Sequence, residues 1–122
     1  LEACEILNKN NIYPTIADAR FAKPLDTKLI DNLLNNHKYI LTIEEGSIGG
    51  FSSHVLHYIH NIRSNKNDSI IKNLIFPDRF IEHMTPEEQY RDIRMDTESI
   101  IVEINNFYEN KIIDINNFKS KV

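Results

Sequence analysis

Two adjacent carboxylates and a cluster of glycines form the segment of this sequence best suited to chemistry. Glu44 and Glu45 follow a short apolar run, and all the glycines of the chain come directly after them, as Gly46, Gly49 and Gly50. Paired carboxylates can act as general acid and general base. However, neighbouring residues of an extended segment point to opposite sides, so these two do not easily share one site. The simpler interpretation is that one of them caps or braces the glycine loop and the other is solvated.

The glycine loop lies between an expected strand and an expected helix, where backbone N–H groups can bind an anion. Its pattern matches neither the dinucleotide-binding G-x-G-x-x-G nor the phosphate-binding G-x-x-x-x-G-K-[ST]. Placing every glycine between positions 46 and 50 indicates positive φ angles or the close approach of another group. We favour close packing of the loop against another domain, and anion binding is the alternative.

Other reactive side chains lack the partners that their chemistry would need. His54, His57 and His60 fan across roughly 120° of one helix surface, so at most two neighbours could share a metal ion. They have no Asp, Glu or Cys beside them at a familiar ligand spacing. Cys4 stands among apolar helix positions, where a cysteine behaves as a small hydrophobe. The serines near the glycines lack the G-x-S-x-G context of a catalytic nucleophile.

Three basic residues are expected at the ends of strands, namely Arg20, Lys23 and Arg79. Such side chains can bind a phosphate or a carboxylate, or form ion pairs across an interface. We favour the interface role. The residues alone therefore indicate a docking rim and no complete catalytic site.

Length and composition define the broad class of protein. A chain of 122 residues suits one domain with one core, and its 41% hydrophobic and 26% charged residues are ordinary for a soluble globular protein. The net charge is −4 without a run of like charges, so neither nucleic acid nor an anionic membrane is expected as a partner. No segment approaches the roughly 20 apolar residues of a membrane span. The single cysteine excludes an internal disulfide.

Hydrophobic periodicity predicts alternating helices and strands. Helices are expected over Leu1–Asn10, from the cap Asp26 to Asn35–Asn36, and over Gly50–Arg63, where the buried stripe is Phe51, Val55, Leu56, Ile59 and Ile62. Strands are expected over Tyr13–Ala19, Tyr39–Ile43 and Ile70–Phe76. A capping box from Thr85 to Glu88 begins the next helix, and Asp96 caps a last one.

This alternation predicts an α/β domain in which a mostly parallel sheet is the middle of three α/β/α layers. Three strands are few for such a sheet, and the sequence begins inside a helical pattern without Met. We therefore expect a further strand upstream of Leu1, and a longer polypeptide of which this sequence is a piece.

Three segments together resemble one known family. They are D-A-R-F-A-K-P-L-D (Asp18–Asp26), T-I-E-E-G-S-I-G-G-F-S-S (Thr42–Ser53) and F-P-D-R-F-I-E-H (Phe76–His83). In this order they look like the C-terminal, transketolase-type domain of the 1-deoxy-D-xylulose-5-phosphate synthase family, over roughly Leu1–Ile101. The first and third segments make the resemblance specific, because transketolases and 2-oxoacid dehydrogenase β chains share the second.

The chain departs from the family pattern at two places. The family usually has glycine where this chain has Met84, and it usually reads G-L-D where this chain has Arg94-Met95-Asp96. Both departures lie in the C-terminal third.

The resemblance implies a function for a longer protein. Members of this family condense pyruvate with glyceraldehyde 3-phosphate and release carbon dioxide, the first step of non-mevalonate isoprenoid biosynthesis. Thiamine diphosphate and Mg²⁺ are held between the first two domains, in segments absent from this sequence. The third domain packs on the second and helps to build the homodimer, so no catalytic, cofactor-binding or metal-binding residue is carried over. Such a protein would be cytoplasmic in a bacterium and located in a plastid-type organelle in a eukaryote.

We therefore expect residues 1–108 to form the transketolase-type domain and residues 109–122 a C-terminal tail. Contacts with the missing domain are expected at Arg20, Phe21, Glu44, Glu45, Gly49, Gly50 and Arg79. The alternative is a non-enzymatic interaction module, since the same domain in 2-oxoacid dehydrogenase β chains meets a partner acyltransferase. A free anion-binding protein that uses the glycine loop is a weaker third possibility.

Overall fold

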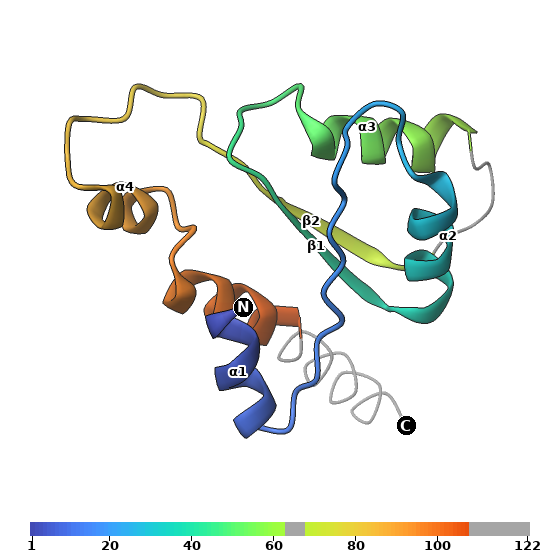
Figure 1. Cartoon of the computed structure of the whole chain (residues 1–122), viewed down its shortest axis with the longest axis horizontal. Helices are drawn as coiled ribbons and strands as arrows, with labels where there is room; N and C mark the ends of the chain where they lie inside the picture. Colours follow the sequence, from blue (N-terminus) through green and yellow to red (C-terminus); the bar gives the residue numbers. More distant parts are fainter. Residues whose placement is uncertain (63–67, 108–122) are drawn as a thin grey trace, which may run out of the picture. The chain divides into compact units, whose positions relative to one another are not determined.

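A computed structural model describes residues 1–62 and 68–107. Figure 1 shows, in chain order, α1 (Glu2–Lys9), α2 (Thr27–Asn36), β1 (Tyr39–Ile43), α3 (Phe51–His57), the π-helical turn η1 (Tyr58–Ile62), β2 (Ile70–Leu74) and α4 (Pro86–Asp92). Residues 97–107 are also helical. The chain divides into a central unit, Ile16–His83, and a terminal unit that combines Leu1–Thr15 with the chain from Met84 onward.

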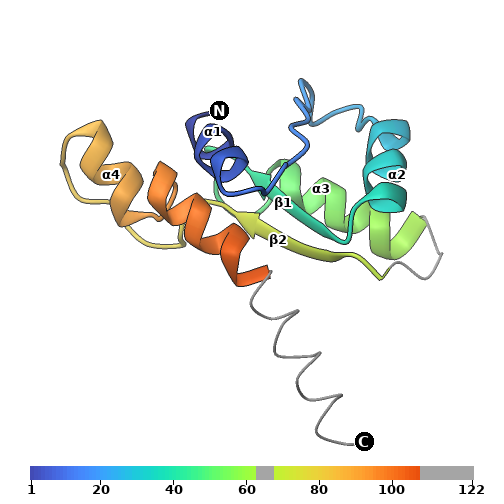
Figure 2. The ribbon, with the colours of Figure 1, turned by 90° about the horizontal axis from the view of Figure 1, so that it is seen from below.

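The sheet of the central unit consists of β1 and β2, which run parallel and lie side by side in Figures 1 and 2. Their register pairs Tyr39 with Ile70 and Ile43 with Leu74. One cross-strand pair is polar, because the buried Thr42 donates from Oγ1 to Asn73 Oδ1 at 2.7 Å. Parallel neighbours require a crossover connection, which α3 and η1 provide.

The core of the central unit lies where the two helical segments cover the sheet. It combines Ile30 and Leu34 of α2 with Val55 of α3 and Ile59 of η1. Each pair is four residues apart, the spacing that places side chains on one face of a helix. From the sheet, the register partners Ile40 and Ile71 pack against this cluster.

The predicted start of α2 is confirmed. Asp26 Oδ1 accepts a hydrogen bond from the backbone N–H of Leu29 at 3.0 Å, which is the expected N-cap interaction. Leu25, just before the cap, packs against the cluster that contains Ile30. Leu25 and Ile30 thereby occupy the two positions of a hydrophobic staple.

One hydrogen bond joins α2 to η1. Tyr58 donates from its hydroxyl to Asp31 Oδ2 at 2.9 Å, in a partly buried position. We expect Tyr58→Phe to destabilise the central unit by about 1 kcal/mol, because it removes a hydrogen bond to a carboxylate. Tyr13→Phe is the matched control, since Tyr13 is 73% exposed and its hydroxyl lies 3.4 Å from Asn11 Oδ1. Urea unfolding measures both variants, and equal effects would contradict a stabilising role for the Tyr58 bond.

In the terminal unit, the buried apolar residues lie in α1, directly after α4 and at the end of the last helix, while α4 itself buries no residue. Ala3 and Leu7 of α1 are buried, as are Ile93, Met95 and Phe107. The side chains of Thr97 and Glu2 connect the last helix with α1 through a hydrogen bond of 2.9 Å.

The capping box at α4 forms as predicted. The Glu88 carboxylate accepts from the Thr85 backbone N–H and from Thr85 Oγ1, both at 2.9 Å, while Glu88 N–H donates to Thr85 Oγ1. These hydrogen bonds from the Thr85 backbone and hydroxyl lower the pKa of Glu88 below its ordinary value of 4.5.

This pKa shift predicts a pH dependence for the start of α4. A carboxyl group whose pKa is lower in the folded state stabilises that state above its unfolded pKa. The contribution is therefore present above about pH 4.5 and is lost as the pH falls through the lowered folded pKa. NMR titration should place the midpoint of Glu88 below 4.5, and Glu88→Gln should remove this part of the pH dependence. A Glu88 midpoint at or above the ordinary value would contradict the prediction.

Both α1 and α4 end in a Schellman motif, in which the residue after the cap adopts a left-handed conformation. At α4, Met95 N–H donates to Tyr90 O at 2.8 Å and Arg94 N–H donates to Arg91 O at 3.1 Å. Arg94 has a φ of 59°. At α1 the same position is Asn11, with a φ of 61°. Asparagine tolerates this conformation, so the predicted end of α1 is confirmed.

Arg94→Gly should stabilise the terminal unit. A side chain with Cβ costs roughly 1–2 kcal/mol in the left-handed region, and the greater freedom of glycine in the unfolded chain offsets part of that gain. We expect a net gain of about 1 kcal/mol in the free energy of unfolding. Arg91→Gly is the control, because glycine inside α4 should destabilise by about 1 kcal/mol. Thermal unfolding of both variants gives the two signs, and a loss of stability in Arg94→Gly would count against the prediction.

Two predictions about the elements are wrong. Tyr13–Ala19 is not a strand, and Ile16 is 58% exposed. In the described part of the chain no strand pairs with this segment, and a β ladder requires a partner. Ile62 was expected in the buried stripe but is 61% exposed. The π-helical turn at Tyr58–Ile62 has wider i to i+5 hydrogen bonding, which rotates its last residues away from that stripe.

The other expected elements form close to their predicted bounds, and β1 spans Tyr39–Ile43 as predicted. The predicted last residue of the third helix, Arg63, and the expected tail 109–122 lie outside the described residues. Within the described ranges, no helix combines the length and the apolar character that crossing a membrane would require.

Candidate functional site

The candidate site is the carboxyl edge of the sheet, where open α/β folds commonly bind ligands. Residues 44–50 leave β1 there as the glycine loop, and residues 75–83 leave β2 (Figure 1). We call these two loops the rim. They begin together, because Glu44 N–H donates to Leu74 O at 3.1 Å and Phe76 N–H donates to Gly46 O at 2.8 Å. The parallel pairing of β1 and β2 therefore continues into the rim.

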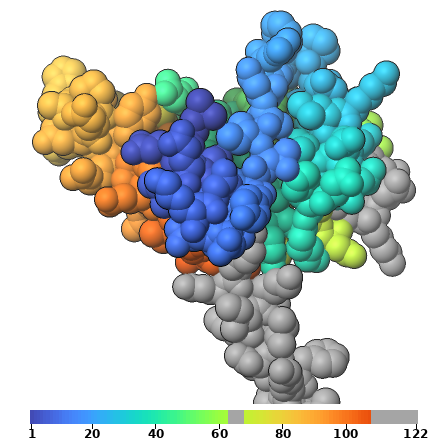
Figure 3. Space-filling view, turned by 60° about the horizontal axis from the view of Figure 1, so that its bottom comes forward, coloured from blue at the N-terminus to red at the C-terminus, as the bar shows by residue number. Residues whose placement is uncertain are grey.

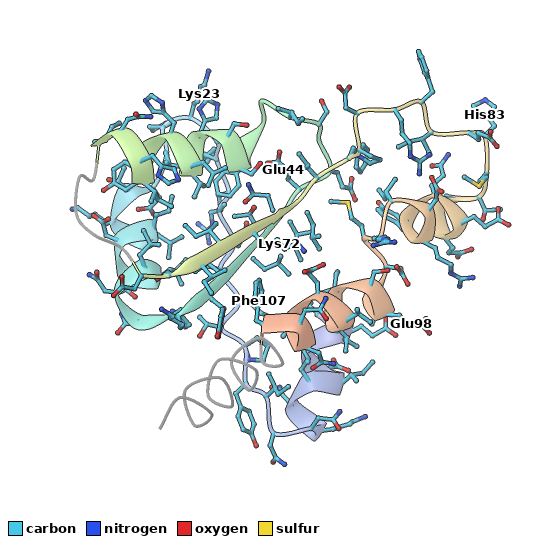
Figure 4. The ribbon with its side chains drawn as sticks, turned by 180° about the vertical axis from the view of Figure 1, so that it is seen from behind. Lys23, Glu44, Lys72, His83, Glu98 and Phe107 are labelled. Atoms are coloured by element: carbon cyan, nitrogen blue, oxygen red, sulfur yellow. The ribbon has the colours of Figure 1, made fainter. Side chains whose placement is uncertain are left out.

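Glu44 braces the glycine loop. Its Oε2 accepts from the backbone N–H of Ser52 at 2.9 Å, and Ser52 Oγ lies 3.4 Å from Oε1. Ser52 is only 2% exposed, so the carboxylate holds the first turn of α3 from inside the loop. Figure 4 shows Glu44 at the end of β1, close to the start of this helix. Glu45, in contrast, is exposed.

Two positions of the loop require glycine, each for a different physical reason. Gly50 faces Glu44 so closely that a Cβ there would overlap Oε1 and lie 3.1 Å from Cδ. Gly49 has a φ of 104°, which residues with a side chain rarely adopt. The close approach expected at the loop therefore comes, at Gly50, from a carboxylate of the same loop.

Two backbone donors of the loop and one at the start of α3 are used within the chain. Gly49 N–H donates to Ser53 Oγ at 3.0 Å and Gly50 N–H donates to Ser47 O at 3.3 Å. Ser52 N–H donates to Glu44. An internal carboxylate thus takes the position that an anion would occupy at the start of the helix. This arrangement disfavours the anion-binding interpretation.

The predicted contact residues fall into two groups. Glu44, Glu45, Gly49, Gly50 and Arg79 lie on the two loops of the rim.

Arg20 and Phe21 lie on the segment before α2, where Figure 3 shows the light-blue residues projecting from the surface. Phe21 is 67% exposed. Arg20 has a φ of 54°, and its backbone N–H donates to Asp18 Oδ1 at 3.0 Å. Lys23, on the same segment, is exposed.

The sequence interpretation missed two apolar residues of the rim. Phe80 is 99% exposed and Ile48 is 71% exposed. Each is a large apolar residue inside a loop, outside the periodic pattern of any helix or strand. This position is the sequence signal that could have indicated an exposed contact residue. Contiguous apolar side chains on a surface commonly mark interaction sites, but a single apolar residue in a loop draws little attention.

The histidines of the third helical segment are not collected around a common point. His57 and His60 are exposed, His54 is half-buried, and the ring of His57 lies 3.2 Å from Asn61 Nδ2. Among residues 1–62 and 68–107, no group of three His, Cys, Asp or Glu side chains is placed to hold a metal ion.

Comparison with known proteins agrees with this fold. Residues 1–100 match the family model described as "Transketolase, C-terminal domain". A rice (Oryza sativa subsp. japonica) protein named "Probable 1-deoxy-D-xylulose-5-phosphate synthase 2, chloroplastic" is 45% identical over 92 residues, which are 75% of this chain and 13% of the rice protein. The 1-deoxy-D-xylulose-5-phosphate synthase of Rhodobacter capsulatus is 42% identical over 90 residues, which are 74% of this chain and 14% of that enzyme.

Helices combined with a parallel sheet place the protein in the α/β class, as predicted. The chain belongs to the transketolase C-terminal domain family. The family expectation drawn from its three segments is thereby confirmed. The matched segment spans only 13–14% of the length of the two relatives.

Proposed function

We propose that this chain is the C-terminal domain of a longer 1-deoxy-D-xylulose-5-phosphate synthase. The observation that carries the proposal is the identity of 45% and 42%, over about three quarters of the chain, to two proteins with that name. The full protein would condense pyruvate with glyceraldehyde 3-phosphate and release carbon dioxide. Its place would be the first step of non-mevalonate isoprenoid biosynthesis.

Within that enzyme, this domain has a structural role and supports the homodimer. Glu44, the carboxylate that faces Gly50, is engaged with Ser52 at the start of α3. Thiamine diphosphate and Mg²⁺ would be held by the preceding domains, as the family resemblance implies. We therefore assign no catalytic, cofactor-binding or metal-binding residue to this chain.

The docking contacts with the preceding domain are proposed at Arg20, Phe21, Glu44, Glu45, Gly49, Gly50 and Arg79. Exposure supports direct contact for Arg20, Phe21, Glu45 and Arg79. Glu44 and Gly50 would act indirectly, since their close approach shapes the glycine loop. An alanine scan of the seven positions in the full-length enzyme tests this set. Unchanged assembly, stability and turnover in all seven variants would refute it.

The location of the full protein follows from its source. The rice relative is named as chloroplastic, which supports a plastid-type organelle if the source is a eukaryote. A bacterial source would place the enzyme in the cytoplasm.

Enzyme assay of the full-length protein tests the main proposal. With thiamine diphosphate and Mg²⁺, it should form 1-deoxyxylulose 5-phosphate from pyruvate and glyceraldehyde 3-phosphate. The 122-residue chain alone is the control and should be inactive under the same conditions. An immunoblot of the source cells adds a second test, because the antigen should appear far above 14.3 kDa. A band at the mass of the chain itself would exclude the multidomain enzyme.

The alternative function is a non-enzymatic interaction module, like the corresponding domain of 2-oxoacid dehydrogenase β chains. The shared glycine-loop segment favours it, whereas the Asp18–Asp26 segment favours the synthase. Co-purification of a dihydrolipoyl acyltransferase with the full-length protein, without synthase activity, would support the alternative.

A further inference from the structure

Two loops of the rim each present one apolar side chain to solvent. Phe80 is 99% exposed on the loop after β2, and Ile48 is 71% exposed on the glycine loop. Covering a phenylalanine removes roughly 150–250 Å² of surface from water. Large aromatic side chains are also frequent anchors at the centres of interfaces. A partner that covers the rim would therefore bury more apolar surface than the seven predicted contact residues alone indicate.

Phe80 and Ile48 lie on loops that internal hydrogen bonds hold in place. The loop of Phe80 is tied at its start by the bond from Phe76 N–H to Gly46 O, and Arg79 N–H donates to Pro77 O at 2.8 Å. The loop of Ile48 is held by the Glu44 carboxylate and by the bond from Gly50 to Ser47. An anchor that is already ordered loses less conformational entropy on binding.

We propose that Phe80 and Ile48 are the apolar anchors by which this domain docks onto a preceding domain of the same polypeptide. This inference rests on the proposed function, in which the chain is one part of a multidomain enzyme. Glu44 and Gly50 then act as positioning residues, because they hold the loop that carries Ile48. Phe80 and Ile48 extend the seven proposed contact residues.

The surroundings of Phe80 favour a domain of the same chain over a second copy. Asp78, Arg79, Glu82 and His83 are exposed neighbours of Phe80 in the sequence, so the anchor has polar neighbours that include both signs of charge. Interfaces between domains of one chain are more polar than permanent subunit interfaces. The matched relatives are also about seven times as long as the segment they share with this chain, which provides such a partner domain.

Hydroxyl-radical footprinting of the full-length protein measures the exposure of Phe80 without a mutation. Phe107 is the internal standard for a buried ring, with 7% exposure against 99% for Phe80 in this chain. If Phe80 is docked, its labelling rate should fall toward that of Phe107, by up to about fourteenfold, which is the ratio of the two exposures. Labelling of Phe80 at the rate of a free phenylalanine peptide would overturn the proposal.

Protection of Phe80 must also be independent of dimerisation. Footprinting at two protein concentrations, with the mass measured by light scattering, distinguishes docking onto a domain of the same chain from docking onto a second copy. Protection that persists in the monomer supports docking within one chain. Protection that disappears on dissociation assigns the anchors to a second copy and overturns the proposal.

Variants of the full-length protein provide an independent readout. Phe80→Ala and Ile48→Ala should each lower the midpoint of thermal unfolding. Phe80→Ala should also raise hydroxyl-radical labelling of the glycine loop, and Ile48→Ala that of the loop after β2. Ile62→Ala is the matched control for Ile48→Ala, because Ile62 is 61% exposed and lies at the end of η1. Equal midpoints for all three variants would count against docking. A synthase assay of the same samples distinguishes the proposed enzyme function from the proposed docking anchors. An active enzyme in which Phe80 stays exposed would refute the anchors and leave the enzyme function standing.

Discussion

Leu34→Ala is expected to destabilise the central unit by about 3 kcal/mol, the typical cost of removing a buried leucine side chain. Leu34 is 5% exposed and belongs to the cluster with Ile30, Val55 and Ile59. These residues come from α2, α3 and η1, so the cavity would open where the helical segments meet the sheet. Close packing leaves the surrounding side chains little freedom to fill it.

Urea unfolding followed by far-ultraviolet circular dichroism measures this effect, because the chain has no tryptophan to report by fluorescence. Ile62→Ala is the control, since Ile62 is 61% exposed and its truncation should change the free energy of unfolding by less than about 0.5 kcal/mol. A cost below about 1 kcal/mol for Leu34→Ala would contradict the packing of α2 described above.

Gly50→Ala is expected to destabilise the glycine loop by about 2 kcal/mol, the value of a hydrogen bond to a charged group. The new methyl group would overlap Glu44 Oε1 and lie 3.3 Å from Oε2. The end of a glutamate side chain can move, but Glu44 would then lose its bond to the Ser52 backbone N–H at 2.9 Å. That donor is buried at the start of α3, where an unsatisfied N–H group is costly.

A double-mutant cycle identifies the cause. Glu44→Ala should cost about as much as Gly50→Ala, because both remove the same carboxylate from Ser52. The two substitutions together should cost little more than either one, since the methyl group enters the space left by the carboxylate. The expected coupling energy is therefore about 2 kcal/mol.

Gly46→Ala is the matched control for Gly50→Ala. A Cβ at Gly46 would lie 3.7 Å from Glu44 Oε1, which is an ordinary van der Waals contact. This variant should therefore stay close to the stability of the wild-type chain. Additive effects of Glu44→Ala and Gly50→Ala would show that Gly50 is needed for a reason other than the carboxylate.

The elements that the sequence predicts correctly depend on interactions between near neighbours. The Asp26 cap bonds to the backbone three residues later, and so does the capping box from Thr85 to Glu88. Asn11 ends α1 because its own side chain tolerates a positive φ. Likewise, β1 is a short run rich in apolar and β-branched residues, whose length and composition favour a strand.

The site was only partly predictable. The sequence places the glycines and both carboxylates in one loop, and its three family segments identify the transketolase C-terminal domain. It does not reveal that position 50 needs glycine to leave room for the Glu44 carboxylate, because that contact depends on how the loop folds back on itself. It also does not distinguish Phe80 from a core phenylalanine, since both have the same side chain.

Fold class, family, the caps at Asp26 and Thr85 and the position of the glycine loop were thus determined by the sequence itself. The tertiary structure decided that Tyr13–Ala19 does not form a strand, that Ile62 faces solvent, and that the Ser52 backbone donor at the start of α3 binds an internal carboxylate. The physical reason is the range of the interactions. Propensities and caps act within one or two turns of chain, whereas a strand or a buried stripe exists only where a partner lies against it. The pairing of Thr42 with Asn73, 31 residues apart, is of this second kind.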